Sequence, residues 1–228
     1  IKDIDNLKKD INTKEIYIFP MKINEKEAIK TLENANGNCY AIFGDCSEMT
    51  KYFCMEKGIK IKELLYDPIY QLQNSIATSQ GVLSEVIAKT EYNLDAQTAL
   101  ICGYGNCGKK IARLLWLCGC EIYIFSRERG IKIASQDGFN TCDSLDKNAR
   151  LQMFDIIVNT VPAKIFTKEI IEQLSEETTF FQVASGMSGI DCDLLSEKGI
   201  PFYGLWGLPA KYSAASEAEL ISQITLNF

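Results

Sequence analysis

The chain has no histidine among its 228 residues. Imidazole is the side chain whose charge changes near neutral pH, and it is also the commonest metal ligand in proteins. Its absence excludes Ser-His-Asp hydrolysis, zinc sites built on histidine, and hydride transfer that relies on a histidine acid or base. Any proton transfer must therefore use another group.

Positive charge is also scarce, since 24 Lys and Arg residues face 30 Asp and Glu residues, giving a net charge of −6 and a pI of about 4.9. An acidic chain without a basic run is a poor candidate for binding nucleic acids or anionic membrane surfaces. No apolar stretch approaches the roughly 20 residues of a membrane helix. Residues 1–5 do not resemble a signal peptide and lack Met, so we expect a cytoplasmic protein that begins at a cleavage site or an engineered boundary.

Nine cysteines are present, but the CxxC spacing typical of redox and zinc sites is absent. The odd number and the lack of a secretory segment favour reduced thiols, which usually serve as small buried apolar residues. No metal site is expected, because zinc requires four convergent ligands. Cys107 has two interpretations: it gains thiolate character from a helix N-terminus, or it is simply a small residue in a tight loop.

A glycine-rich loop in the middle of the chain is the strongest motif. Residues 98–102, Thr-Ala-Leu-Ile-Cys, have the apolar character of a buried parallel strand, and the GxGxxG loop 103–108 follows directly. Residues 109–117 place apolar side chains at helical spacing, and 121–125 form a second apolar strand. Strand, GxGxxG, helix and strand within about 30 residues are typical of a dinucleotide-binding unit.

The three glycines of this loop have separate predicted roles. Gly103 permits a tight turn, Gly105 lets a diphosphate approach the backbone, and Gly108 lets helix and strand pack closely. The helix N-terminus then offers free N–H groups and the positive end of the helix dipole to the phosphates. We predict a bound dinucleotide; the alternatives are a Rossmann-like fold that has lost its ligand and a mononucleotide fold with chance glycines.

The end of the second strand indicates which dinucleotide is bound. An NAD site usually has an acid about 20 residues beyond the glycine loop, but the only acid between Gly108 and Arg127 is Glu121, which begins the strand. The strand ends instead in Ser126-Arg127-Glu128-Arg129, where a hydroxyl and two guanidinium groups suit a 2′-phosphate. We expect NADP rather than NAD; in the alternative, Arg127 stacks on adenine and Arg129 is solvated.

Later segments continue a doubly wound pattern. Residues 155–162 and 179–186 are predicted as apolar strands that end in polar or small residues, and 200–204 as an edge strand. Because ligands lie at the carboxyl edge of such sheets, we expect residues 160–162 beside the nicotinamide ribose. The predicted cofactor-binding residues are Gly103, Tyr104, Gly105, Asn106, Cys107, Gly108, Ser126, Arg127, Arg129, Thr160, Val161, Pro162 and Ala184.

The N-terminal part of the chain has a separate α/β pattern without a GxGxxG motif. Strands are predicted at 15–19 and 39–43, an extended run at 59–66, and helices at 25–34 and 47–57.

The predicted fold class is α/β, a Rossmann doubly wound parallel sheet with a second, smaller and truncated α/β domain. We assign residues 1–78 to the small domain and 79–212 to the NAD(P)-binding domain. Asp67-Pro68 is interpreted as a break in structure, and 79–90 as a helix that connects the two. Residues 213–228 are predicted as a terminal helix, a candidate to pack on the small domain.

Five segments occur in an order and at a spacing that resemble a known family. They are Asn74–Gly81, Gly103–Arg113, Asn159–Pro162, Val183–Ser185 and Gly207–Ala210. The chain from about Cys39 onward thereby resembles the family of dipicolinate synthase A subunits, which act in spore-forming bacteria. The resemblance implies a two-domain fold like that of D-2-hydroxyacid dehydrogenases and NADP-linked oxidation of a dihydro- or hydroxytetrahydro-dipicolinate. It also implies a flavoprotein-like partner, the B subunit of dipicolinate synthase, and, by analogy of fold, a homo-oligomer.

The resemblance also assigns substrate-binding residues. It places Asn74, Ser75, Thr78 and Gln80 in an interdomain cleft, facing Gly207, Leu208 and Pro209. Short polar side chains before a helix N-terminus can hold a carboxylate through N–H and O–H donors. The proton acceptor is left open among Lys211, Tyr212 and Glu217, with Lys211 and Tyr212 as catalytic candidates.

Three positions depart from the family pattern. Gln80 stands where the family has Glu, Gly186 where it has Arg, and Ala215 where it has Lys. A dicarboxylate is best held by cations, so Lys211 is a candidate replacement. These departures favour an alternative, a non-catalytic relative that binds NAD(P) as a regulator or scaffold. A third alternative is a different oxidoreductase or hydrolase with the same two-domain plan.

Overall fold

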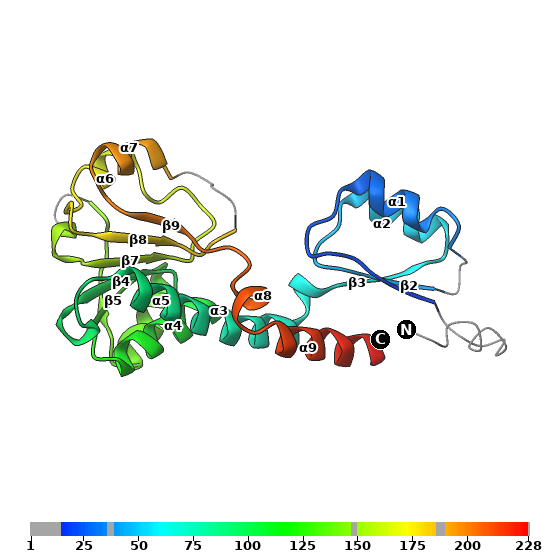
Figure 1. Cartoon of the computed structure of the whole chain (residues 1–228), viewed down its shortest axis with the longest axis horizontal. Helices are drawn as coiled ribbons and strands as arrows, with labels where there is room; N and C mark the ends of the chain where they lie inside the picture. Colours follow the sequence, from blue (N-terminus) through cyan, green and yellow to red (C-terminus); the bar gives the residue numbers. More distant parts are fainter. Residues whose placement is uncertain (1–14, 36–38, 147–149, 186–189, 228) are drawn as a thin grey trace. The chain divides into compact units, whose positions relative to one another are not determined.

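The computed structural model describes residues 15–35, 39–146, 150–185 and 190–227 (Figure 1). The chain divides into two compact units. Unit 1 comprises the described parts of Ile1–Gln71 and of Glu219–Phe228, and unit 2 comprises the described parts of Leu72–Ala218. The boundary predicted after residue 78 lies inside helix α3 (Pro68–Lys89).

Unit 2 is built on a sheet of six parallel strands in the order β6-β5-β4-β7-β8-β9. The chain runs outward from β4 through β5 to β6, then returns to the other side of β4 and runs outward again through β7, β8 and β9. This is the doubly wound order of a Rossmann fold, so the predicted fold class is confirmed. The strands are β4 (Thr98–Cys102), β5 (Glu121–Phe125), β6 (Asn140–Thr141), β7 (Ile156–Asn159), β8 (Thr179–Gln182) and β9 (Phe202–Gly204).

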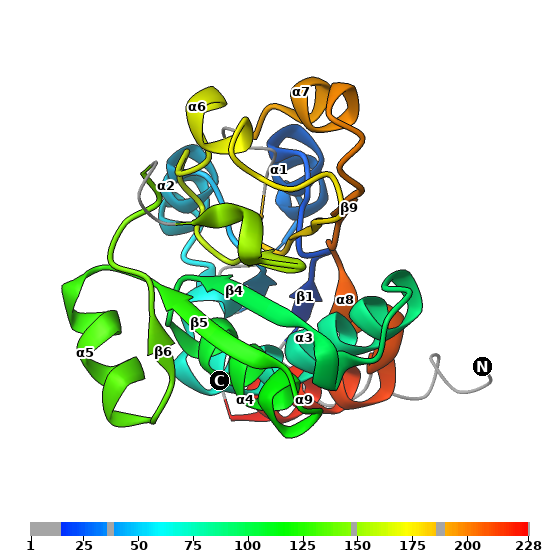
Figure 2. The same ribbon diagram turned by 90° about the vertical axis from the view of Figure 1, so that its left-hand side faces the viewer.

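Side chains of the central strand β4 alternate between two cores. Ala99 and Ile101 pack with residues of α3, α4 (Asn106–Leu117) and α5 (Glu128–Gln136). Leu100 and Cys102 pack with residues of α6 (Lys168–Ile171) and α7 (Cys192–Glu197). Figures 1 and 2 show α4 and α5 on one side of this sheet and α6 and α7 on the other. A strand covered on both faces must be apolar along its length, which explains the run at 98–102.

Helix α3 begins at Pro68, well before the predicted start at residue 79. The Oδ1 atom of Asp67 accepts hydrogen bonds from the backbone N–H groups of Ile69 and Tyr70, both at 2.9 Å. Proline is favoured in the first turn of a helix, where its missing N–H costs nothing. The predicted break at Asp67-Pro68 is therefore wrong, because this pair starts a helix.

Unit 1 contains a sheet of three parallel strands in the order β1-β2-β3, flanked by helices. Its main core joins Leu32 and Cys54 of the helices to Phe43 of the central strand. The elements are β1 (Ile16–Ile18), α1 (Glu25–Leu32), β2 (Tyr40–Phe43), α2 (Glu48–Glu56) and β3 (Lys60–Glu63).

The C-terminal helix α9 (Ala214–Leu226) contributes to a second cluster in unit 1. Leu220 and Ile224 pack there with Ile42, Leu64 and Tyr70. The end of the chain thus completes the core of a unit that is otherwise formed by its beginning.

Other elements differ from the expected pattern. Helix α5 was not predicted, although Ile133 and Ala134 pack it against the sheet. The expected extended run 59–66 ends at Glu63 and passes into a 3₁₀ turn at Leu64–Tyr66. The remaining short elements are 3₁₀ turns at Leu94–Ala96 and Leu151–Met153 and helix α8 (Leu208–Tyr212).

Within the described ranges, no helix has the length and apolarity needed to cross a membrane.

Candidate dinucleotide site

The candidate site lies at the carboxyl ends of β4 and β7, which are neighbours in the sheet. From β4 the chain leads to one half of the sheet, and β7 begins the other half. Ligands of doubly wound sheets bind at this reversal of strand order. The loops that emerge here are 103–108 and 160–162, the two segments that the sequence predicted to hold the cofactor.

Gly103 makes the turn out of β4 with a φ of +95°, a conformation that residues with a Cβ rarely adopt. Its N–H donates to the carbonyl oxygen of Phe125 at 2.7 Å, which ties the loop to the end of β5. A Cβ at this position would lie 2.4 Å from Oγ1 of Thr160. The Thr160 hydroxyl donates to the carbonyl oxygen of Cys102 at 2.8 Å. This hydrogen bond connects the loop after β7 to the end of β4.

The other two loop glycines meet opposite surroundings. A Cβ at Gly105 would have no described heavy atom within 4 Å, so the backbone there faces open space. A Cβ at Gly108 would lie 2.1 Å from the carbonyl oxygen of Gly103. Gly105 thus leaves room for a ligand, and Gly108 permits close packing of helix and strand, as the motif predicts.

Helix α4 begins at Asn106, directly beyond this opening. Its N-cap is Gly105, and in the described structure no side chain caps the helix start. The first N–H groups of a helix have no partner within it, so they are available to an anion. The open backbone and the uncapped helix start fit a diphosphate.

Tyr104 and Cys107 contribute to the loop in ways that the motif did not indicate. The Tyr104 side chain is 6% exposed, and its hydroxyl donates to Oδ2 of Asp137 at 2.8 Å, so only its backbone can meet a nucleotide in the loop. Burial raises the pKa of the Cys107 thiol, which argues against the interpretation as a thiolate. Cys107 is a small residue in a tight loop.

The end of β5 lies beside the glycine loop, and one serine and two arginines follow this strand. Ser126 packs against Gly130: a Cβ at Gly130 would lie 2.2 Å from the Oγ atom of Ser126. Arg127 is the N-cap of α5 and Arg129 belongs to its first turn; both are exposed. Glu121 starts β5 at the opposite end of the strand, as predicted, and accepts from the Tyr123 hydroxyl at 3.2 Å.

Two buried amides hold the carboxyl ends of β7 and β8, and the sequence interpretation missed both. Asn159 donates from Nδ2 to Oε1 of Gln182 at 2.9 Å, and its Oδ1 accepts from the N–H of Val161 at 3.0 Å. Each amide side chain is 1% exposed. The carbonyl oxygen of Ala184 accepts from Trp206 Nε1 at 3.3 Å. The sequence did carry a signal for them, because each amide is the polar last residue of an otherwise apolar strand. A buried amide at such a position needs hydrogen-bond partners.

The two specific segments of the family resemblance meet within unit 2. A Cβ at Gly81 of α3 would lie 2.8 Å from Cβ of Leu208 in α8. Gly207, with a φ of +69°, turns the chain into α8 and is its N-cap. Leu208 is 2% exposed, so it serves as a packing residue, and Pro209 occupies the first turn of this short helix.

The polar residues of α3 do not precede a helix N-terminus, which corrects their predicted chemistry. Asn74, Ser75 and Thr78 all lie inside α3, whose backbone N–H groups bond along the helix. Ser75 is fully buried, and its hydroxyl donates to the carbonyl oxygen of Leu72 at 2.6 Å. These residues therefore do not offer a helix-start anion site; Gln80 is exposed on the same helix.

Lys211 and Tyr212 share one partner, the buried carboxylate of Glu85 on α3. The Lys211 ammonium forms a close ion pair with Oε1 of Glu85, and the Tyr212 hydroxyl donates to the same atom at 2.6 Å. These hydrogen bonds, that of Lys211 first, lower the pKa of Glu85, and the same pair raises the pKa of Lys211. Lys211, which we expected to replace the family's cations, is thus neutralised by Glu85. The sequence interpretation did not single out Glu85.

Two further positions complete the comparison with the sequence. Ala215 is exposed near the start of α9, and Gly186 lies outside the described residues. Among the residues that the structure describes, no group of three or more Cys, Asp or Glu side chains is arranged to hold a metal ion.

Comparison with known proteins places this geometry in a family. The family described as D-isomer specific 2-hydroxyacid dehydrogenase, NAD binding domain, matches residues 67–188, more than half of the chain. The A subunit of dipicolinate synthase from Bacillus subtilis (strain 168) is 20% identical over 204 residues, which cover 88% of this chain and 69% of that protein. The predicted resemblance to the dipicolinate synthase A subunits is confirmed.

Solved structures show the same fold. The dipicolinate synthase A chain from Bacillus subtilis superposes with a TM-score of 0.79 at 18% identity, covering 95% of this chain and 78% of that one. The corresponding dipicolinate synthase chain from Bacillus halodurans gives a TM-score of 0.78 at 17% identity, covering 87% and 69%. The transhydrogenase of Sinorhizobium meliloti gives 0.63 at 12% identity, covering 89% and 69%. The family match indicates a nicotinamide cofactor.

Proposed function

The chain belongs to the family of D-isomer specific 2-hydroxyacid dehydrogenases through its NAD-binding domain, and from this premise we propose that it is an NADP-dependent oxidoreductase. The observation that carries the proposal is the loop 103–108, open at Gly105 and followed by an uncapped helix start. When bound, the nicotinamide supplies the hydride acceptor.

Different residues of unit 2 bind different parts of the cofactor. The N–H groups at the start of α4 hold the diphosphate, and Ser126 and Arg127 hold the 2′-phosphate. Residues 160–162 and Ala184 line the nicotinamide end. Support comes from the hydrogen bond between Gly103 and Phe125, which keeps the end of β5 beside the glycine loop, and from the absence of an acid in 122–127.

The proposed substrate is a dihydro- or hydroxytetrahydro-dipicolinate, by similarity to the dipicolinate synthase A subunits. By the same similarity we propose a cytoplasmic homo-oligomer that works with a dipicolinate synthase B subunit. Positioning can supply much of a hydride-transfer rate, so the lack of histidine is compatible with catalysis. Lys211 and Tyr212 stay candidates for the proton acceptor, and each would have to exchange its bond with Glu85 for one with substrate.

A second candidate function is a non-catalytic NAD(P)-binding regulator or scaffold. The observation that favours it is the ion pair of Lys211 with Glu85, since this pair removes a cation that a dicarboxylate needs. Steady reduction of NADP with the proposed dicarboxylates would exclude this candidate. Tight nucleotide binding without turnover would support it.

Parallel calorimetric titrations with NADP and NAD test the cofactor assignment. In the Arg127→Ala variant the Kd for NADP is expected to rise at least about tenfold, while that for NAD changes by less than about twofold, because only NADP carries the 2′-phosphate. Lys132→Ala is the matched control, since Lys132 is an exposed cation on the same helix α5. Tighter binding of NAD than of NADP to the unmodified protein would overturn the assignment.

A further inference from the structure

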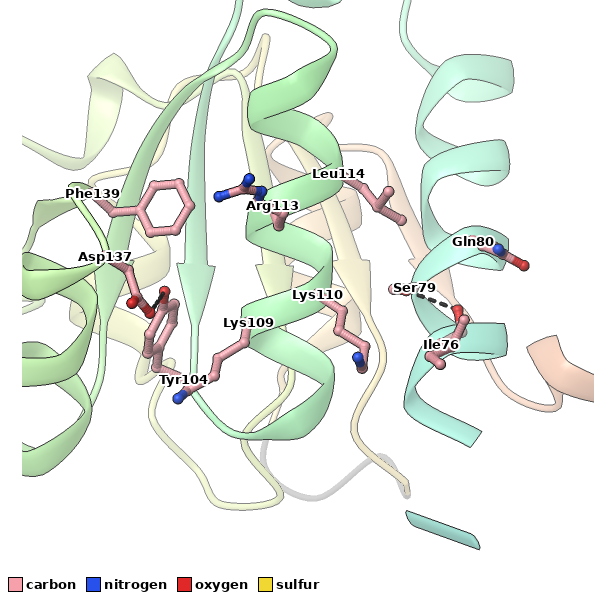
Figure 3. A pocket seen from close by; sticks show the side chains of 10 residues that line it. All are labelled: Ile76, Ser79, Gln80, Tyr104, Lys109, Lys110, Arg113, Leu114, Asp137 and Phe139. Atoms are coloured by element: carbon pink, nitrogen blue, oxygen red, sulfur yellow. Dashed lines mark hydrogen bonds between the residues drawn. The ribbon is translucent and has the colours of Figure 1, made fainter. Parts of the chain in front are cut away.

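Unit 2 contains a cavity of about 450 Å³ over the outer face of α4, away from the sheet (Figure 3). The helix faces the sheet with Ile111, Ala112 and Leu115, which are buried. Its other side meets the cavity, together with residues of α3 and the segment that follows α5. The lining residues are Ile76, Ser79, Gln80, Tyr104, Lys109, Lys110, Arg113, Leu114, Asp137 and Phe139.

Three cations of α4 line this cavity, and the proposed dinucleotide site does not use them. They are Lys109, Lys110 and Arg113. Among the residues that the structure describes, none of the three forms an ion pair with a carboxylate. Lys109 Nζ lies 5.4 Å from the centre of the Tyr104 ring, and Arg113 Cζ lies 5.2 Å from that of Trp116. Aromatic faces hold Lys109 and Arg113 in place without neutralising their charge.

The acid in the lining is already engaged. Asp137 accepts the hydrogen bond of the Tyr104 hydroxyl at 2.8 Å; burial, and then this bond, raise the pKa of Tyr104. Asp137 therefore positions the Tyr104 ring, over which Lys109 sits. Figure 3 shows Lys110 turned toward the α3 side of the cavity and Arg113 toward Phe139, so positive charge is spread along its length.

The rest of the lining suits a small organic molecule. Ile76, Leu114 and Phe139 provide apolar walls, and Gln80 offers an exposed amide. Cavities of about 300–1,000 Å³ are the usual size for small-molecule sites. A hydrocarbon frame with separated anionic groups would meet both the apolar walls and the spaced cations.

We propose that this cavity binds a small organic polyanion, with two or more carboxylate or phosphate groups, at a site distinct from the dinucleotide site. The ligand lies across the outer face of α4, with its anionic groups on Lys110 and Arg113 and its carbon frame against Leu114 and Phe139. Such a site would let a metabolite bind while the nucleotide loop is occupied. The proposal does not depend on the proposed function.

Citrate and fructose 1,6-bisphosphate are the probes, one for carboxylate and one for phosphate groups, with acetate as a singly charged control. The chain has two tryptophans, so Trp206→Phe leaves Trp116, next to Arg113, as the fluorescence reporter. Titration of this variant is expected to show saturable binding of at least one polyanion and none of acetate. A response that is linear with every salt would overturn the proposal.

Two variants locate the binding. In the Trp206→Phe background, Lys110→Glu/Arg113→Glu is expected to weaken binding of the polyanion at least about tenfold, while the control Lys132→Glu changes it by less than about twofold. Gly105→Ala separates the two sites: it should weaken nucleotide binding and leave the polyanion affinity unchanged. Equal polyanion affinity in the Lys110→Glu/Arg113→Glu variant, or loss of it in Gly105→Ala, would overturn the proposal.

Light scattering tests the competing occupant, a second copy of the chain. With a polyanion site, the mass is expected to be the same for the unmodified protein and the Lys110→Glu/Arg113→Glu variant. A mass of twice 25.6 kDa that falls to one chain in this variant would assign the face to self-association and overturn the proposal.

Discussion

Helix α4 of unit 2 starts in a different way from helices α1 and α2 of unit 1. In unit 1, Asn24 caps α1 by accepting from the N–H of Lys26 at 2.9 Å, and Ser47 caps α2 by accepting from that of Thr50 at 3.1 Å. In unit 2, α4 starts at a glycine, and no described side chain takes its N–H groups. A cap satisfies these donors within the protein, whereas an uncapped start leaves them for an anion. The β-α connections of unit 1 are thus closed by a cap, and the one that leads into α4 is left open to an anion.

The glycines at these connections differ in the same way. A Cβ at Gly44, after β2, would lie 2.4 Å from the backbone oxygen of Met21. At Gly105, after β4, the same atom would have no described neighbour within 4 Å. At Gly44 another segment of the protein packs against the backbone, whereas at Gly105 the backbone is open to a ligand.

Substituting these two glycines gives the largest expected effects. Gly44→Ala should destabilise the protein by about 2 kcal/mol or more, because the added methyl group meets backbone that can yield only by shifting. Gly105→Ala should leave the unfolding midpoint nearly unchanged and weaken NADP binding by about tenfold or more. Thermal unfolding and calorimetric titration of both variants check this. A large loss of stability in Gly105→Ala would break the comparison.

Removing a cap in unit 1 should have a smaller effect. Asp67→Ala is expected to cost about 1–2 kcal/mol, because α3 loses the cap on two N–H groups and Lys62 loses its partner at 2.6 Å. Asp67→Asn keeps an acceptor at the helix start and should cost less. Urea unfolding measures both, and equal losses would show that the ion pair with Lys62 matters more than the cap.

Glu85 provides the smallest expected effect, together with a pH dependence in unit 2. Glu85→Gln should cost about 1 kcal/mol at pH 7, because Lys211 and Tyr212 lose a charged acceptor. The pKa of Glu85 is lowered below its ordinary value of 4.5, so its contribution is present above that value and is lost as the pH falls through the lowered pKa.

The stability difference between the unmodified protein and Glu85→Gln should therefore be constant near neutral pH and shrink below pH 4.5. Urea unfolding at several pH values measures it. Tyr212→Phe is the matched variant, since it removes one hydrogen bond and keeps the ion pair. A difference that grows toward acid pH would contradict the assigned role of Glu85.

Much of unit 2 could be predicted because its signals are local. The run 98–102 is apolar, the glycines follow it, and the helix and second strand come next, so a stretch of about 30 residues identifies the unit. The start of α3 was misplaced because Asp67-Pro68 looks the same in a break as in a capped helix start. Helix α5 was missed because Arg127 and Arg129, at its start, were interpreted as ligands of a 2′-phosphate.

The sequence by itself determined the α/β class, the glycine loop and the missing acid at the end of β5, because these depend on neighbouring residues and on backbone freedom. Only the tertiary structure decided that Gly105 faces open space, that Asn159 bonds Gln182, and that Glu85 holds Lys211 from 126 positions away. Such pairs depend on how helices and strands pack, and spacing along the chain carries no record of that packing.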